Sequence, residues 1–433
     1  EFAFDGVGPV LIESNQGHSP NTGNGYHNDV WLFGASAESA RFAKWLANEI
    51  YGAPVHHAYI FGASGGGHRS FQCLMRAPDV YDGAVPQVFG VNPAPYWSIM
   101  GQAVSLLGRD IKKVRDALEP GGSGDPFEGL SYPQREALRD IFHFGYPRGA
   151  TTQLSNMPVF PFALYNTLNY NPDYFRAFWE DRGYLGADQP QRLAARLVRV
   201  TTTAREVVAA SSLSTEMIVA MQLATAGATP QSPYGLFVEM DDPKQALMAK
   251  LTVKTGKAAG REMVIASVAR TGALVPFSEM CPELFDGVEP GDVVEIDNRD
   301  WIAFCHLYLH DVEWNVPGLH APDARVPNDY DRFALDGNPV FPQVPTAQYD
   351  LNLVTPFPGK MIYIGATHDV AIWPSKITLF DQYVRKALGE TVSDNYRLWW
   401  VENSTHGRAE MGSASDGAPG HVWRTRLVDY EAV

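Results

Sequence analysis

A five-residue turn, Gly62-Ala63-Ser64-Gly65-Gly66, constrains the fold more than any other feature of the sequence. The apolar run at 58–61 predicts a short strand before the turn, and residues 67–77 predict a helix that stops before Pro78. A serine flanked by glycines between a strand and a helix is typical of the G-x-S-x-G turn of α/β enzymes. The pattern therefore predicts a parallel α/β arrangement around residue 64.

The chemistry of this turn explains its residues. A serine held on a sharp strand-to-helix turn points its hydroxyl outward, and we expect the glycines two residues away on each side to make room for the backbone. The N–H of Gly65 then lies at a helix N-terminus, where an oxyanion can be stabilised. We therefore predict Ser64 as a nucleophile and Gly65 as an oxyanion donor. The alternative interpretation is a plain glycine turn.

A serine nucleophile needs a base to accept its proton and an acid to orient that base. In α/β enzymes with this turn, the acid and then the base follow the serine along the chain, each in a loop after a strand. The predicted strand at 361–364 leads into Asp369, and the predicted strand at 398–401 leads into His406. We predict Asp369 as the acid and His406 as the base, with solvated loop residues as the alternative.

Three other histidines are candidates for a supporting role in binding substrate or orienting the site. His68 follows Ser64 by one helical turn, which favours a structural or pocket-lining role over that of a base. His368 precedes Asp369 directly and is interpreted as a pocket or loop residue. His18 follows the apolar run at 9–13 and is predicted to lie near the edge of the site.

The rest of the chain divides by pattern. Apolar runs predict strands at 9–13, 360–365 and 396–401, and apolar spacing predicts helices at 36–51 and 374–388. Between these α/β segments, helical periodicity is assigned to 99–118, 131–142 and 189–226, whereas 263–268 and 292–296 are predicted strands. We therefore expect an α/β core split between residues 1–96 and 351–433. Residues 97–350 are expected to form a large mixed helical and β insertion.

Composition excludes several classes of protein. The 433-residue chain has a formal net charge of −15 and shows no Lys/Arg cluster, which argues against a nucleic-acid partner. No apolar stretch approaches the roughly 20 residues of a membrane-spanning helix, so no membrane partner is expected. Three widely spaced cysteines predict neither a disulfide framework nor a zinc site. The compartment stays open on these grounds.

The sequence resembles the tannase and feruloyl esterase family of α/β-hydrolases. The resemblance runs from the Ile50-Tyr51-Gly52 segment through the serine turn to Tyr81-Asp82-Gly83-Ala84-Val85, with shorter matches at Asn15-Gln16-Gly17-His18, His368-Asp369 and Thr405-His406-Gly407. It covers roughly residues 8–100 and 355–410. The resemblance implies an α/β-hydrolase core of mostly parallel sheet, with the insertion as a lid over the site.

Two departures from the family pattern are present. Family members carry a disulfide between a cysteine just before the nucleophile and a cysteine just after the base. This chain has Ala63 at the first position and Gly407 at the second. The chain is thus expected to be an atypical member with a triad that lacks this staple. Family members also have strands and a glycine-rich oxyanion loop ahead of the strand matching 10–13. We expect either that this segment has been removed or that another segment takes its place, with Asp5-Gly6-Val7-Gly8 as the local candidate for the second oxyanion donor.

The resemblance implies a secreted or periplasmic location and, in some members, calcium bound in the lid. Oxygen ligands for calcium could come from Asp241-Asp242 or Asp297-Asn298, but neither pair forms a spaced loop, so solvated turns are the simpler interpretation. We expect no cofactor.

The leading interpretation is a serine hydrolase that cleaves a small-molecule carboxylic ester, aryl or hydrophobic, through an acyl-enzyme. A polyester depolymerase, amidase or acyltransferase would use the same three residues. An inactive hydrolase fold that serves as a binding protein is the non-enzymatic alternative.

Overall fold

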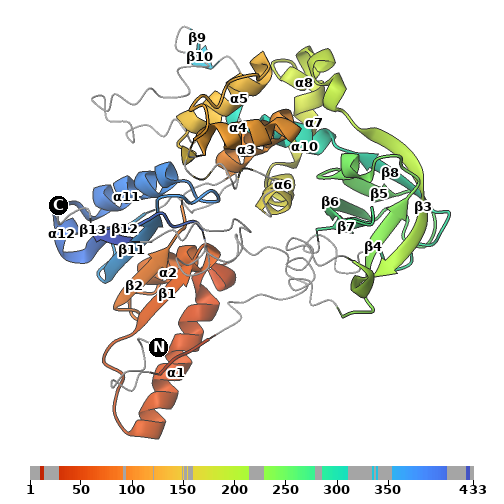
Figure 1. Cartoon of the computed structure of the whole chain (residues 1–433). Coiled ribbons are helices and arrows are strands. Elements are labelled where there is room, and N and C mark those ends of the chain that lie inside the picture. Colours follow the sequence, from red (N-terminus) through yellow and green to blue (C-terminus); the bar gives the residue numbers. More distant parts are fainter. Residues whose placement is uncertain are drawn as a thin grey trace.

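The computed structural model describes residues 10–13, 29–90, 94–119, 121–148, 150, 154, 159–213, 229–277, 285–310, 334–335, 338–339, 354–406 and 426–429. Within these ranges the chain forms an α/β part around an open sheet, a group of helices and a closed β-barrel (Figure 1). The fold class is α/β with an additional antiparallel barrel.

The open sheet has five strands in the order β1-β2-β11-β12-β13, and all neighbours are parallel except β12 and β13. The two halves of the chain meet at the centre of the sheet, where Ala84 of β2 pairs with Met361 of β11. Sheets of this kind bury apolar side chains under covering helices. The strand bounds are β1 Tyr59–Ala63, β2 Gly83–Gln87, β11 Lys360–Ala366, β12 Tyr396–Glu402 and β13 Arg426–Asp429.

Two helices cover one face of this sheet: α2 (Gly65–Arg76) and α11 (Pro374–Leu388). Phe71 of α2 and Phe380 of α11 meet edge to face, with 4.9 Å between their ring centroids. Phe380 also contacts the ring of Tyr363 on β11. All three side chains are fully buried. Such aromatic contacts each add about 0.5–1.5 kcal/mol beyond area burial, so they fix both helices against the strands that carry the candidate site.

A group of helices lies above the sheet in Figure 1. Ser98 of α3 donates a 2.6 Å hydrogen bond to the carbonyl of Phe304 in α10, which joins two helices about 200 residues apart in sequence. A capping box of Ser131 and Gln134 begins α5. The bounds are α3 Ala94–Leu107, α4 Ile111–Leu118, α5 Tyr132–His143, α6 Val159–Tyr170, α7 Pro172–Glu180, α8 Leu185–Asp188 and α10 Arg299–Cys305.

The barrel, at the right of Figure 1, closes in the order β3-β4-β7-β6-β5-β8. It has its own apolar core, which includes the fully buried Leu236, Leu251 and Ile296. Closure leaves no unpaired edge strand. The strands are β3 Arg199–Ala209, β4 Pro233–Val238, β5 Lys250–Val253, β6 Glu262–Val268, β7 Leu274–Pro276 and β8 Val293–Asp297.

The shorter elements connect or extend these parts. Helix α1 (Ala35–Tyr51) precedes β1, helix α12 (Val392–Asn395) precedes β12, and strands β9 (Ala334–Leu335) and β10 (Asn338–Pro339) form a small antiparallel pair. The remaining helical turns are η1 Val30–Gly34, η2 Gly108–Asp110, η4 Pro190–Arg192, η5 Ala194–Arg196, η6 Ala210–Ser212, η7 Pro243–Ala246, η8 Leu307–Leu309 and η12 Gly389–Thr391.

Several predicted elements are confirmed. The strand–turn–helix unit around Ser64, the helix at 374–388 and the strands at 263–268, 292–296, 360–365 and 396–401 all form at or within two residues of the expected bounds. The helical stretch at 99–118 is interrupted by η2, where Gly108 has a φ of +51°. The strands and helices around Ser64 and between residues 360 and 401 are therefore predictable from apolar spacing.

Two expectations about elements are wrong. Helical periodicity was expected at 189–226, but Arg199–Ala209 forms barrel strand β3, which is rich in β-branched threonine and valine. The run at 10–13 is not a strand in the structure, and Val10, Leu11 and Ile12 are 42–52% exposed. A short apolar run becomes a buried strand only when a partner strand pairs with it, and no described strand pairs with these residues.

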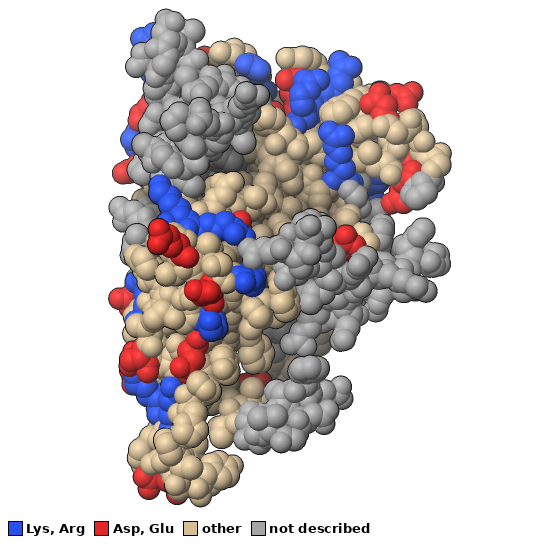
Figure 2. Space-filling view, turned by 90° about the vertical axis from the view of Figure 1, so that its left-hand side faces the viewer, with Lys and Arg blue, Asp and Glu red and all other residues tan. Residues whose placement is uncertain are grey.

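Charged side chains of both signs lie on the surface (Figure 2). Figure 2 shows Lys and Arg side chains mixed with Asp and Glu on one face of the molecule. Among the described helices, none is long and apolar enough to cross a membrane.

Candidate active site

Ser64 sits at the junction of β1 and α2 with a strained backbone, φ +55° and ψ −122°. Its N–H donates to the carbonyl of Gln87 at 2.9 Å, and its carbonyl accepts from the N–H of His68 at 3.0 Å. A non-glycine residue in this region costs on the order of 1–3 kcal/mol and persists only where surrounding contacts hold it. The two backbone hydrogen bonds, one to β2 and one within α2, help to stabilise this backbone conformation of Ser64.

The glycines around Ser64 have unequal roles. A Cβ on Gly62 would lie 2.6 Å from the backbone of Gly66, so this position requires glycine. A Cβ on Gly67 would lie 2.4 Å from the carbonyl oxygen of Gln87, which makes Gly67 equally restricted. Gly66 itself faces open space. The expectation that both glycines of the turn must lack a Cβ is therefore correct at Gly62 and wrong at Gly66, because the tight approach to β2 falls one residue later.

Backbone strain gathers at one edge of the sheet. The non-glycine residues with positive φ in the described ranges are Ser64, Val88, Met248 and Asn403. Ser64, Val88 and Asn403 directly follow β1, β2 and β12, at the carboxyl ends of parallel strands. Ligand and catalytic sites of open α/β sheets lie outside these ends, so the strain marks the same edge.

Asp369 follows β11 at this edge and is completely buried. Its Oδ1 accepts hydrogen bonds from the backbone N–H groups of Ala371 at 2.9 Å and Ile372 at 2.8 Å. These bonds form an Asx-type turn that fixes the direction of the carboxylate. A buried carboxylate of this kind needs a hydrogen-bonded partner, and His406 is that partner.

His406 follows β12, and its Nδ1 lies 3.1 Å from Oδ1 and 2.9 Å from Oδ2 of Asp369. Because a carboxylate only accepts, Nδ1 carries the proton and Nε2 of the neutral ring is a free acceptor position for a base. Burial alone would lower the pKa of His406, but the charge of Asp369 and the hydrogen bond to it outweigh burial and raise that pKa above its usual value. The His406 side chain is 30% exposed, whereas the side chain of Asp369 is fully buried.

Hydrogen bonds between the two loops hold this pair in place. The N–H of His368 donates to the carbonyl of Ser404 at 2.9 Å, and the N–H of Asn403 donates to Oγ1 of Thr367 at 2.9 Å. The imidazole Nδ1 of His368 lies 3.0 Å from the same threonine oxygen. Burial lowers the pKa of His368, which favours its neutral form. His368 is thus a loop residue next to the acid, facing Thr367.

Ser64 and the Asp369–His406 pair lie on the same edge, since the parallel strands β1, β2, β11 and β12 are consecutive neighbours. With about 4.8 Å between strands, β1 and β11 are roughly 10 Å apart. The hydrogen bonds of Ser64 within the described part of the chain are those of its backbone. The hydrogen bond from Ser64 to His406 therefore stays a prediction. Gly65 is the first residue of α2, so its N–H has no intrahelical acceptor and points out of the helix N-terminus.

His68 lies inside the core rather than at the edge. It is 5% exposed, and its Nε2 is 3.2 Å from Nε2 of Gln72. The amide oxygen of Gln72 accepts from Nε of Arg76, so the amide nitrogen faces His68 and donates to it. Burial, together with the charges of Arg69 and Arg76, lowers the pKa of His68 to about 3, and the ring is neutral at ordinary pH.

Several expected residues fall outside the described ranges: His18, the Asp5–Gly8 stretch proposed for the second oxyanion donor, and Gly407. No group of three or more potential metal ligands occurs in the described residues. Of the two acidic pairs, Asp242 accepts from the N–H of Lys244 and Asp297 pairs with Arg299 at 2.7 Å.

Sequence reasoning missed the residues that hold the loops. The Asx turn after Asp369 carries a readable signal, because aspartate often caps the backbone two or three residues ahead. Thr367 and Gln87 carried no signal of this kind. Trp97, whose indole N–H donates to the carbonyl of Ala371 at 2.9 Å, lies 274 residues away from its partner, and no local pattern links the two.

No protein-family model matches the chain. No curated protein sequence matches it. Among solved structures, it is similar to feruloyl esterase B from Aspergillus oryzae, with 15% identity and a TM-score of 0.33 over 90% of this chain and 62% of that one. An esterase from Aspergillus oryzae gives 13% identity and a TM-score of 0.30 over 90% of this chain and 61% of that one. The chain thus spans less than two thirds of the length of either structure. Because both TM-scores are below 0.5, the function proposed below rests on the geometry of this chain.

Proposed function

We propose that this protein hydrolyses carboxylic esters with Ser64 as nucleophile, His406 as base and Asp369 as the residue that orients the base. The observation that carries the proposal is the buried Asp369–His406 hydrogen bond at the sheet edge where Ser64 is held in a strained turn. A serine in such a turn and an oriented imidazole are the two parts that acyl transfer requires.

In the proposed reaction, His406 Nε2 takes the proton of the Ser64 hydroxyl while Oγ attacks the ester carbonyl. The N–H of Gly65 donates to the oxyanion of the tetrahedral intermediate. His406 then passes the proton to the leaving alcohol, and an acyl group remains on Ser64. Water, deprotonated by His406, attacks this acyl group and releases the acid. Asp369 stays ionised and stabilises the imidazolium in both halves.

The proposed fold family is that of the α/β-hydrolases, with the insertion as a lid. Four parallel strands with the nucleophile, acid and base at their carboxyl ends, in that order along the chain, support this assignment. We also propose that the chain is an atypical relative of the tannase and feruloyl esterase group. This finer assignment rests on the resemblance around Ser64, Asp369 and His406.

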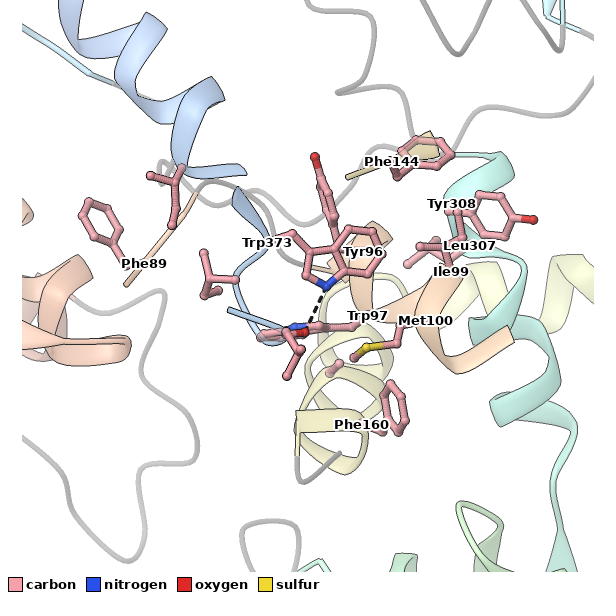
Figure 3. Close-up of a cluster of buried hydrophobic side chains, with 14 of the residues drawn as sticks. Phe89, Tyr96, Trp97, Ile99, Met100, Phe144, Phe160, Leu307, Tyr308 and Trp373 are labelled. Atoms are coloured by element: carbon pink, nitrogen blue, oxygen red, sulfur yellow. Dashed lines mark hydrogen bonds between the residues drawn. The ribbon is translucent and has the colours of Figure 1, made fainter. Parts of the chain in front are cut away.

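The preferred ester is a separate question. An aromatic lining of the site would support the aryl or hydrophobic ester expected from the sequence. The aromatic side chains that meet the acid loop, among them Tyr96, Trp97 and Trp373, are buried against one another (Figure 3). They build the core at this junction, so they lend no support to an aryl substrate. The proposal accordingly covers small-molecule carboxylic esters as a class.

The test is a side-by-side panel of aryl, alkyl and polymeric esters with an amide and an acyl acceptor. Wild type is expected to hydrolyse at least one small ester, and Ser64→Ala is expected to lose this activity with little change in thermal unfolding. Turnover of only amides or polymers would favour an amidase or a depolymerase, and product formed on the acceptor would favour an acyltransferase. No turnover of any member by folded protein would favour a binding role.

A further inference from the structure

We infer that Trp97, in the first helix of the insertion, is a positioning residue for the acid of the catalytic pair: its indole N–H holds the turn that directs the Asp369 carboxylate at His406. The inference rests on the proposed function. It assigns the insertion a part in setting the reacting geometry, in addition to any part as a cover.

The first step concerns the turn itself. The carboxylate of Asp369 is oriented by two N–H groups of the following turn, those of Ala371 and Ile372. Any change in the direction of these peptide groups therefore moves the carboxylate. Ala371 and Ile372 are 4% and 8% exposed, so solvent cannot substitute for a missing partner in this turn.

The second step concerns the opposite side of the same turn. Its carbonyls accept from two indoles: Trp97 donates to Ala371 at 2.9 Å, and Trp373 donates to Val370 at 2.9 Å. The Trp373 bond is local to the loop, whereas the Trp97 bond comes from α3. The residue Ala371 is therefore bonded on both sides, through its N–H to the acid and through its carbonyl to the insertion.

The third step concerns how rigidly Trp97 is held. Its ring packs against the ring of Phe162 in α6, with 6.0 Å between the ring centroids. The neighbouring Tyr96 meets Trp373 edge to face, with 4.8 Å between the ring centroids. Figure 3 shows Tyr96, Trp97 and Trp373 gathered between α3 and the acid loop. A second hydrogen bond links the start of α11 to the residue after α5, because the Ser375 hydroxyl donates to the carbonyl of Phe144 at 2.6 Å. Rotamers locked by packing are what precise positioning of a catalytic group requires.

The consequence is specific to the pair. Without the Trp97 N–H, the buried Ala371 carbonyl loses its partner and the turn rotates to find another. Asp369 then no longer meets His406 in the observed geometry. Since the Asp369 carboxylate raises the pKa of His406 against the effect of burial, that pKa is expected to fall when the carboxylate turns away.

The experiment replaces Trp97 by phenylalanine, which keeps an aromatic ring and removes the N–H donor. Trp179→Phe is the matched control, because Trp179 also donates its indole N–H to a backbone carbonyl in the insertion, that of Arg299 at 3.2 Å. The primary readout is the titration of His406, followed by NMR in protein with labelled histidine and assigned with His406→Ala. The second readout is kcat and KM on an ester that wild type hydrolyses.

In Trp97→Phe, the His406 titration is expected to move to lower pH, and kcat to fall roughly 10- to 100-fold with KM nearly unchanged. Trp179→Phe is expected to match wild type in both. A wild-type titration and kcat in folded Trp97→Phe would overturn the inference. If that variant does not fold, 3-benzothienylalanine at position 97 removes the N–H with almost no change in shape. The titration needs no turnover, so a chain without esterase activity would refute the proposed function and still decide the role of Trp97.

Discussion

Gly67→Ala is the substitution that tests the strained turn most severely. The new Cβ would lie 2.4 Å from the carbonyl oxygen of Gln87, whereas ordinary contacts begin near 3.4 Å, so α2 and β2 must separate by about 1 Å. Overpacking of this kind costs roughly 1–3 kcal/mol. The separation also strains the hydrogen bond from Ser64 N–H to the same carbonyl, worth about 1 kcal/mol. We expect a total loss of about 2–4 kcal/mol in the free energy of unfolding.

Gly66→Ala is the matched control one residue earlier. A Cβ there meets nothing within 4 Å, and Gly66 lies in the first turn of α2, where alanine is favoured over glycine by up to about 1 kcal/mol. Equilibrium unfolding in urea, followed by tryptophan fluorescence, compares both variants with wild type. The reasoning is refuted if Gly67→Ala unfolds at the same urea concentration as Gly66→Ala.

Two further predictions concern the acid–base pair. His406 must be neutral to accept a proton, and Asp369 raises its pKa, so kcat/KM is expected to fall with decreasing pH through a midpoint above about 6.5. A pH–rate profile that stays flat down to pH 5 would contradict this sign. His406→Ala is expected to lower kcat by at least about 10³-fold, whereas His368→Ala, which removes the imidazole next to Thr367, is expected to lower it less than about tenfold. The reverse order would transfer the role of base to His368.

The sequence was informative where one element carried its own pattern. Strand β11 and helix α11 were readable because apolar residues repeat with the period of each element and Pro374 marks the start of the helix. Asp369 and His406 were placed by the same logic, since each directly follows a strand. Their hydrogen bond brings together two residues 37 positions apart, as expected for neighbouring parallel strands.

The sequence was uninformative where the local structure depends on contacts with residues far away in the chain. Barrel closure depends on pairing β3 with β8, about 95 residues later, and a helical reading of β3 was wrong because local apolar spacing does not contain that partner. The need for glycine at Gly67 rather than Gly66 comes from the approach of β2, which no local pattern shows. The Trp97 bond to the acid turn is of the same kind.

The identity of the nucleophile is tested most directly by a fluorophosphonate probe that forms a covalent bond with an activated serine. Wild-type protein is expected to gain one probe mass, located by peptide mapping on Ser64, and His406→Ala is expected to react far more slowly. Ser64→Ala is expected to gain none. An adduct on another residue, or labelling of folded Ser64→Ala at the wild-type rate, would contradict the proposed role of the strained serine.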